Sequence, residues 1–254
     1  MTDVPRRVKL HRRDVTLDGR VFTVLSPRPS EPLRIATNHA HETWHILSNP
    51  TSARFVAWLM LHVSRERHPN TIAVIDQRFL VPNPFDGDAS DPIVIMNSNL
   101  GTPGRRGLAA LSGRLPLGRS EGTVRLNVGS IDDAWDTNWS LRPAHQRRCR
   151  IDSVKGMTVI AAPGPTLCWL ALAGLRFWAD EFSYGGSSSN YMDDRWYTQP
   201  WIGFGPWTER AGEFQVFLDF DERVRAATAR RNKLFPGDSR TKLTPDEREL
   251  VWRK

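Results

Sequence analysis

Hydrophobic and polar residues alternate most clearly near the start of the chain, between Val15 and Val24. This two-residue period is typical of a strand with one buried face. The pair Asp18-Gly19 stands at the centre of the segment and suits the positive φ angles of a tight turn. The pattern therefore predicts a β-hairpin near the N-terminus.

Helical periodicity appears between Phe55 and Val63, where apolar residues recur three or four positions apart. Polar capping residues precede this run, and His68-Pro69-Asn70 ends it. A second apolar helix is expected from Leu167 to Phe182, directly after an apolar strand. Two helices of this kind predict a sizeable buried core.

Short runs of apolar and β-branched residues predict the other strands. They lie at Thr71–Ile75, Pro92–Met96, Thr123–Val128, Met157–Ala162 and Phe214–Phe220. A weak helix is expected near Leu108–Leu111, and a basic helix should follow Asp221 through about Phe235. The hairpin favours an α+β fold with a mixed sheet, and the alternation of strands and helices in the second half leaves α/β as the alternative.

The end of the chain has its own signals. Thr244 and Glu247 have the spacing of a capping box, and Pro245 suits the first helical position. We therefore expect one globular α+β domain over residues 1–235, followed by a linker and a short C-terminal helix over residues 236–254.

Composition narrows the class of protein. The 254 residues include only two cysteines, which excludes a disulfide framework and a four-cysteine zinc site and favours a reducing compartment. The longest apolar stretches are well short of the roughly 20 residues that a bilayer span needs. We expect a cytoplasmic protein that is soluble and not attached to a membrane.

Charge gives the leading functional hypothesis. The net charge is +7, and the cations concentrate in residues 1–20, 142–155 and 223–254. Such segments attract nucleic acid or an acidic protein partner if they meet on one surface, whereas a solvated arginine-rich surface is the plain alternative. The candidate anion-binding residues are Arg105, Arg106, Arg147, Arg148, Arg150, Arg230, Arg231 and Lys233.

Aromatic residues gather in a second candidate region, a long segment from Ser183 to Pro206 and just beyond, rich in Gly, Ser and Asn. Long loops of this composition often carry function. Aromatic side chains there could stack on bases or anchor a partner, although large aromatics also fill cores. The candidate contact residues are Trp196, Tyr197, Trp201 and Trp207.

Three histidines, His39, His41 and His45, form the densest reactive cluster. On a strand His39 and His41 would share a face, and on a helix His41 and His45 would, at a spacing that suits a transition metal. The cluster has one residue too many for a zincin helix, so polar loop histidines are the competing interpretation.

Two further segments bear on catalysis. The glycine-rich segment from Asn99 to Gly107 could cradle a phosphate, with Arg105 and Arg106 as donors, but it is not a P-loop. Cys149 lies between two arginines that would favour its thiolate, and His145 could act as its base. No third, orienting group is evident.

Taken together, the sequence favours a basic binding protein without catalysis, engaging nucleic acid or another acidic partner. One alternative is an enzyme acting on a phosphorylated or anionic small molecule through the histidine cluster. Another is a subunit of a larger assembly or oligomer. The sequence names no cofactor.

Overall fold

The chain folds around two mixed β-sheets, one of seven strands and one of four. The computed structural model describes residues 7–40, 43–127, 148–172, 202–204, 211–237 and 242–252. Sheets with both parallel and antiparallel pairs, combined with helices, make this an α+β fold, which confirms the fold class expected from the sequence.

The seven-stranded sheet has the order β7-β1-β2-β5-β6-β9-β8. Its strands are β1 (Arg7–Leu17), β2 (Arg20–Pro27), β5 (Thr71–Ile75), β6 (Ile93–Asn97), β7 (Gly122–Asn127), β8 (Arg150–Val154) and β9 (Met157–Ala162). The pairs β2–β5 and β6–β9 are parallel, and the other neighbours are antiparallel.

The four-stranded sheet has the order β10-β11-β4-β3. Its strands are β3 (Ile35–Ala40), β4 (Thr43–Ser48), β10 (Ile202–Phe204) and β11 (Ala211–Val216). Strands β4 and β11 run parallel, whereas β3–β4 and β10–β11 are antiparallel.

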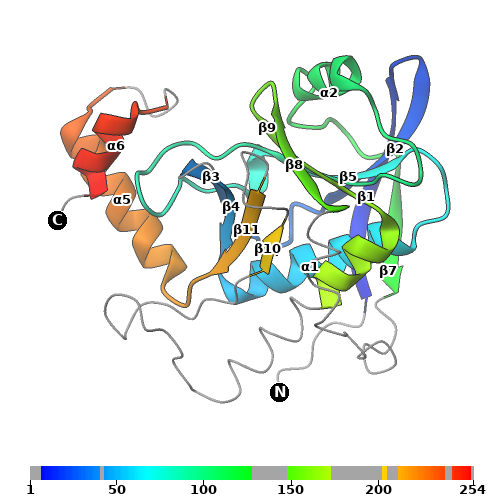
Figure 1. Ribbon diagram of the computed structural model, residues 1–254, viewed down its shortest axis with the longest axis horizontal. Helices are drawn as coiled ribbons and strands as arrows, with labels where there is room; N and C mark the ends of the chain where they lie inside the picture. The colour runs from blue at the N-terminus through cyan, green and yellow to red at the C-terminus, as the bar shows by residue number, and fades with distance from the viewer. Residues whose placement is uncertain are drawn as a thin grey trace.

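The helices divide the molecule into layers (Figure 1). They are α1 (Pro50–Arg65), the 3-10 turn η1 (Gln77–Phe79), α2 (Arg105–Ser112), α5 (Phe220–Leu234) and α6 (Pro245–Trp252), and residues 164–172 are helical as well. Helix α1 shares one hydrophobic core with both sheets, α2 packs on the other face of the large sheet, and α5 packs on the small sheet.

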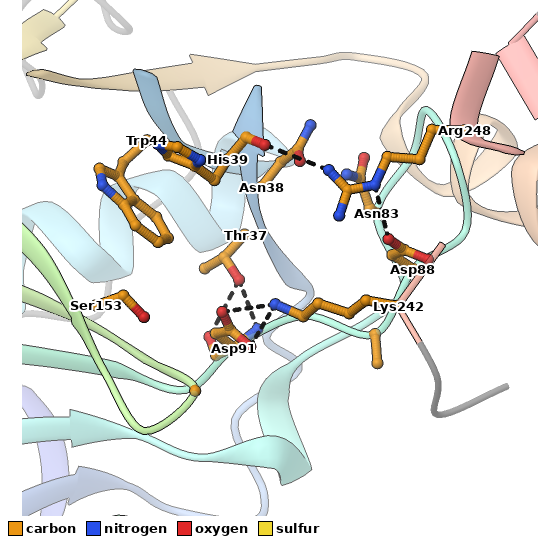
Figure 2. Close-up of a pocket in the computed structure, with 12 residues that line it drawn as sticks. Thr37, Asn38, His39, Trp44, Asn83, Asp88, Asp91, Ser153, Lys242 and Arg248 are labelled. Carbon is orange, nitrogen blue, oxygen red and sulfur yellow. Dashed lines mark hydrogen bonds and ion pairs between the residues drawn. The ribbon is translucent and has the colours of Figure 1, made fainter. Parts of the chain in front are cut away.

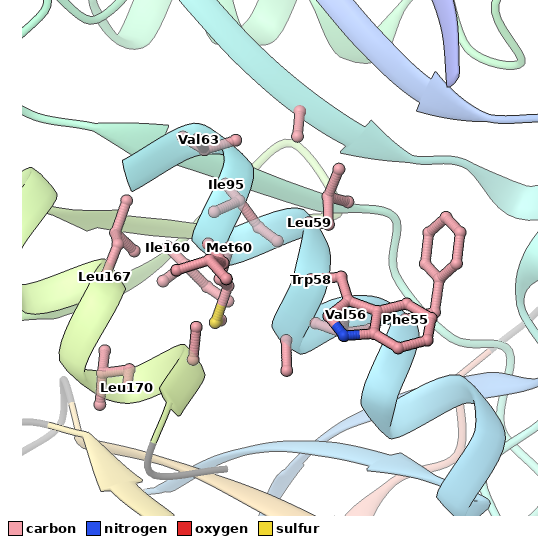
Figure 3. Packing of buried hydrophobic residues seen from close by; sticks show 14 of the residues in the cluster. Phe55, Val56, Trp58, Leu59, Met60, Val63, Ile95, Ile160, Leu167 and Leu170 are labelled. Carbon is pink, nitrogen blue, oxygen red and sulfur yellow. The ribbon is translucent and has the colours of Figure 1, made fainter. Parts of the chain in front are cut away.

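Strands β5 and β6 are buried at every position because both faces of the large sheet are covered. Ala73 and Ile95 contribute to the core around α1, while Ile72 and Val94 contribute to the core beneath α2. This two-sided burial explains why these strands are continuous apolar runs in the sequence. Figure 3 shows the α1 side, where side chains of α1 meet those of β6, β9 and residues 164–172.

Local signals account for the predicted elements. Asp18 and Gly19 have φ angles of 50° and 73°, so the β1–β2 hairpin turns where the sequence indicates. Helix α1 begins at Pro50, capped by the Asn49 side chain, which accepts from the Ser52 amide at 2.9 Å. The helix is buried at ten of its residues, as expected for an apolar core helix.

The C-terminal helix shows the expected capping box. The Thr244 amide donates to the Glu247 carboxylate at 2.8 Å, and the Glu247 amide donates to the Thr244 hydroxyl at 3.4 Å. Helix α6 packs against α5, with Val251 fully buried and its carbonyl accepting from Arg230.

Two expectations need correction. Polar loop histidines before a helix were the competing interpretation of residues 38–45, but the described part of this segment lies in β3 and β4, because the pairing with β11 supplies partners that a local pattern does not show. The N-cap of α5 is Asp219 rather than Asp221. The aromatic candidates Trp196, Tyr197, Trp201 and Trp207 lie outside the described residues.

Within the described part of the chain, every helix is too short or too polar to cross a bilayer.

Candidate functional site

The glycine-rich segment before α2 contacts a carboxylate of the protein itself, that of Asp18. The Gly104 amide donates to the Asp18 carboxylate at 2.6 Å, from the tip of the β1–β2 hairpin. A Cβ atom at Gly107 would collide with the same carboxylate, so glycine is needed there for the close approach. The predicted phosphate cradle is therefore already filled by Asp18, and the enzyme alternative loses that element.

Six exposed cations lie on α2 or on segments next to it in the fold or in the sequence, and together form what we call the α2 surface. They are Arg20, Arg105, Arg106, Arg114, Arg119 and Lys155. None of the six forms an ion pair with a carboxylate in the described residues. Four of them come from residues 92–120, a stretch of the sequence without a single Asp or Glu.

Backbone contacts bring these cations together from separate segments. Arg20 donates to the Thr102 carbonyl at 2.9 Å, just before α2. Arg114, which follows α2 in the sequence, donates to the Thr16 carbonyl at 3.1 Å. The Lys155 carbonyl, in the β8–β9 turn, accepts from the Ser112 hydroxyl at 2.8 Å. Only Arg105 and Arg106 were identified from the sequence, because the others depend on the sheet topology.

The α2 surface continues into an open groove of about 330 Å³ beside β1. Arg114 and Arg119 line the groove together with Asp14 and Glu121, which supply negative charge at this end. The net positive region is therefore the part around α2 itself.

The segment around Cys149 does not form a reactive thiol site. Arg148 and Arg150 are exposed, whereas Cys149 between them is buried in the main core. Burial raises the pKa of the Cys149 thiol to about 12, which overturns the expectation that its neighbours favour the thiolate. Arg147 and His145 lie outside the described residues.

The cations of α5 serve mainly in structure. Arg231 is buried and pairs with Asp88, so its assignment as a surface anion-binding residue is wrong. Arg230 donates to the Val251 carbonyl at 2.8 Å, and Lys233 is exposed. Helix α5 lies at the opposite end of the molecule from α2 (Figure 1), so its cations do not belong to the α2 surface.

The histidine cluster is divided by the β3–β4 pairing. His39 is opposite Trp44 in the register and His45 is opposite Asn38, so His39 and His45 lie on opposite faces of the sheet. The two cannot share one metal ion, and His41 lies outside the described residues. The described residues also contain no group of three His, Cys, Asp or Glu side chains suited to a metal.

His39 instead lines a pocket of about 320 Å³ beside β3 (Figure 2). Its ring lies 4.3 Å from the Trp44 ring, centroid to centroid. Across the pocket, Lys242 pairs with Asp91 at 2.8 Å, and Arg248 pairs with Asp88 at 3.1 Å. The sequence did not reveal this pocket because its walls come from four distant segments: β3–β4, residues 83–91, the β8–β9 hairpin and the C-terminal residues.

No family model matches the chain, and no curated protein or solved structure compared with it does either.

Proposed function

We propose that this protein is a non-enzymatic binding protein that holds nucleic acid by its phosphates on the α2 surface. The observation that carries the proposal is a set of six exposed cations on and beside the eight-residue helix α2, none of which forms an ion pair within the described residues. Cations that are not neutralised internally bind a polyanion with release of its counterions.

Arginine chemistry favours phosphate over a general acidic partner. Five of the six cations are arginines, and the planar guanidinium can donate two parallel hydrogen bonds to one phosphate. Helix α2 begins with Arg105 and Arg106, rises about 10 Å over its eight residues, and is followed by Arg114, so cations near its two ends can reach successive phosphates. An acidic protein remains the alternative partner, since the positive electrostatic potential of the α2 surface would attract it as well.

The expected compartment agrees with this proposal. Both cysteines are free thiols. Free thiols suit the reducing cytoplasm, where nucleic acid is also present.

Salt dependence tests the proposal directly. We expect a fluorescein-labelled oligonucleotide to bind in an anisotropy titration, and its affinity to fall about a thousandfold between 50 and 200 mM salt if about six phosphates are contacted. Binding that is absent at 50 mM salt, or that does not change with salt, would overturn the proposal.

A matched pair of double variants locates the binding surface. Arg105→Gln with Arg106→Gln should weaken binding and reduce the slope of log K against log salt by about two. Arg225→Gln with Lys233→Gln removes the same charge from exposed positions of α5, far from α2, and should leave the slope almost unchanged. Equal losses in the two proteins would show that net charge, and not the α2 surface, is responsible.

A further inference from the structure

The pocket beside β3 has polar groups that the protein does not use. The Asn38 amide and the Ser153 hydroxyl have no hydrogen-bond partner in the described part of the chain. Thr37 is different, because its hydroxyl donates to the Asp91 carbonyl and accepts from the Asp91 amide. The pocket thus offers two solvent-accessible polar groups that a ligand could engage, beside a Thr37 hydroxyl that the protein already uses.

One wall of the pocket is aromatic. Trp44 is half-buried, packed against the main core on one side, and the His39 ring lies beside it at an interplanar angle of 40°. Figure 2 shows both rings on one side of the pocket, with the Lys242–Asp91 pair on the other. A held aromatic wall with polar groups nearby suits a flat heterocycle, which can stack and form hydrogen bonds at its edge.

The pocket and the α2 surface meet at the β8–β9 turn. Ser153 and Gly156 line the pocket, whereas Lys155 between them belongs to the α2 surface. The turn is fixed by left-handed φ angles of 49° at Lys155 and 71° at Gly156, and by the bond from Ser112. A chain that leaves the α2 cations over this turn arrives at the rim of the pocket.

We propose that the pocket takes an unpaired base of a single-stranded nucleic acid whose phosphates lie on the α2 surface. The inference rests on the proposed function and adds the class of partner, a single strand rather than a duplex. Bases of a single strand are free to stack on aromatic side chains, whereas a base in a duplex must first be unpaired and unstacked.

Strand preference is the first test. A single-stranded oligonucleotide should bind more tightly than the duplex of the same sequence at equal salt, and Trp44→Leu should weaken single-strand binding about tenfold while leaving duplex binding unchanged. Trp44→Phe keeps a ring at this position and should retain most of the preference. Equal affinity for single strand and duplex in the native protein would overturn the inference.

A second variant guards against misfolding of the Trp44 proteins. His39→Ala changes an exposed ring and should also reduce the preference for single strands. His68→Ala removes another exposed histidine, outside the pocket lining, and should have no effect. A loss in His68→Ala as large as in His39→Ala would count against the pocket.

Binding of free nucleosides separates this inference from the proposed function. Saturation-transfer NMR with adenosine and cytidine should detect binding that Trp44→Leu abolishes. If nucleosides bind but no oligonucleotide does, the pocket is a site for free bases, and the phosphate-binding proposal fails together with the single-strand inference that rests on it. If oligonucleotides bind with steep salt dependence while neither nucleosides nor the Trp44 variants have any effect, the α2 surface stands and the pocket inference fails.

Discussion

At the scale of single residues, burial can affect a side-chain pKa more than charged neighbours in the sequence do, as Cys149 shows. Cys149 lies between two arginines, but both point to solvent while the thiol faces the core. With its pKa raised to about 12, Cys149 should not react with Ellman's reagent at pH 8 in the folded protein and should react rapidly in urea. The measurement is made in a Cys168→Ser background, and rapid stoichiometric labelling without urea would contradict it.

His62 gives a pH dependence with a definite sign. Its ring lies in the buried helix α1, and burial lowers the pKa of His62 below the ordinary value of 6.5, although Glu66 partly opposes this. As pH falls below 6.5 the unfolded chain binds a proton that the folded protein resists, so the free energy of unfolding decreases.

His62→Leu should remove this loss. Urea unfolding at pH 7.5 and at pH 5.5 should show native protein that loses more stability between the two values than the variant does. Equal changes in the two proteins would mean that His62 contributes nothing to acid sensitivity.

The histidine cluster shows a limit of prediction at the residue scale. The sequence left strand and helix open for residues 39–45, and each gave a different pair of histidines on one face. Strand pairing with β11 decides the matter, and that partner lies more than 160 residues away in the sequence. No local pattern contains this information, so the ligand set could not be chosen from the sequence.

At the scale of elements, the β1–β2 hairpin supplies a carboxylate that the N-terminus of α2 lacks. Helix α2 has no side-chain cap of its own, since Gly104 is its N-cap and two arginines follow. Cations at a helix N-terminus oppose the macrodipole, and the Asp18 carboxylate offsets them from the hairpin.

Asp18→Gly should therefore destabilise the protein by about 1 kcal/mol, the usual cost of losing a cap, even though glycine tolerates the left-handed φ better. Asp18→Asn keeps an oxygen for the Gly104 amide and should cost less. Chemical denaturation of both variants measures this. A glycine variant as stable as the native protein would show that the contact does not support α2.

The same variants bear on binding. Both remove a negative charge that now lies within the α2 surface. Oligonucleotide affinity should therefore rise in Asp18→Asn although its stability falls, and anisotropy at fixed salt tests this. A variant that loses stability and affinity together would indicate that the α2 surface depends on the exact placement of the helix.

The sequence predicted an element correctly where the residues of that element alone contain the pattern that specifies it. Strands β5, β6 and β9, the Asp18-Gly19 turn and the α6 capping box all lie within one residue of their expected positions. It failed at β3, whose polar residues Thr37, Asn38 and His39 line the pocket, while the Thr37 amide donates to the Ser90 hydroxyl. There the environment comes from other parts of the chain, so no regular period is visible.

At the scale of the whole molecule, the distribution of charge along the sequence was a poor guide to charge on the surface. The C-terminal basic segment looked like part of a polyanion site. In the fold, its cations Arg231, Lys242 and Arg248 instead neutralise carboxylates of residues 86–91. The α2 surface is positive for the opposite reason, because none of its arginines forms an ion pair with a carboxylate of the described residues.

This internal pairing predicts how the C-terminal segment is held. Asp88 is buried and accepts from Arg231, from Arg248 and from the Leu243 amide, so one carboxylate joins α5, α6 and the segment between them. Asp88→Ala removes the carboxylate that pairs with the buried Arg231 guanidinium and should cost about 3–5 kcal/mol, as the loss of one member of a buried ion pair does. Asp14→Ala breaks an exposed pair with Arg12 and should cost less than about 1 kcal/mol.

Hydrogen exchange distinguishes local release from general destabilisation. If Asp88 fastens the C-terminal segment, amides of residues 243–252 should exchange faster in Asp88→Ala under conditions where the amides of β5 and β6 stay protected. Arg231→Met combined with Asp88→Ala removes both charges of this buried pair and should recover part of the lost stability. Uniform acceleration across the large sheet, or no recovery in the double variant, would show that the carboxylate supports the core as a whole and not the docking of α6.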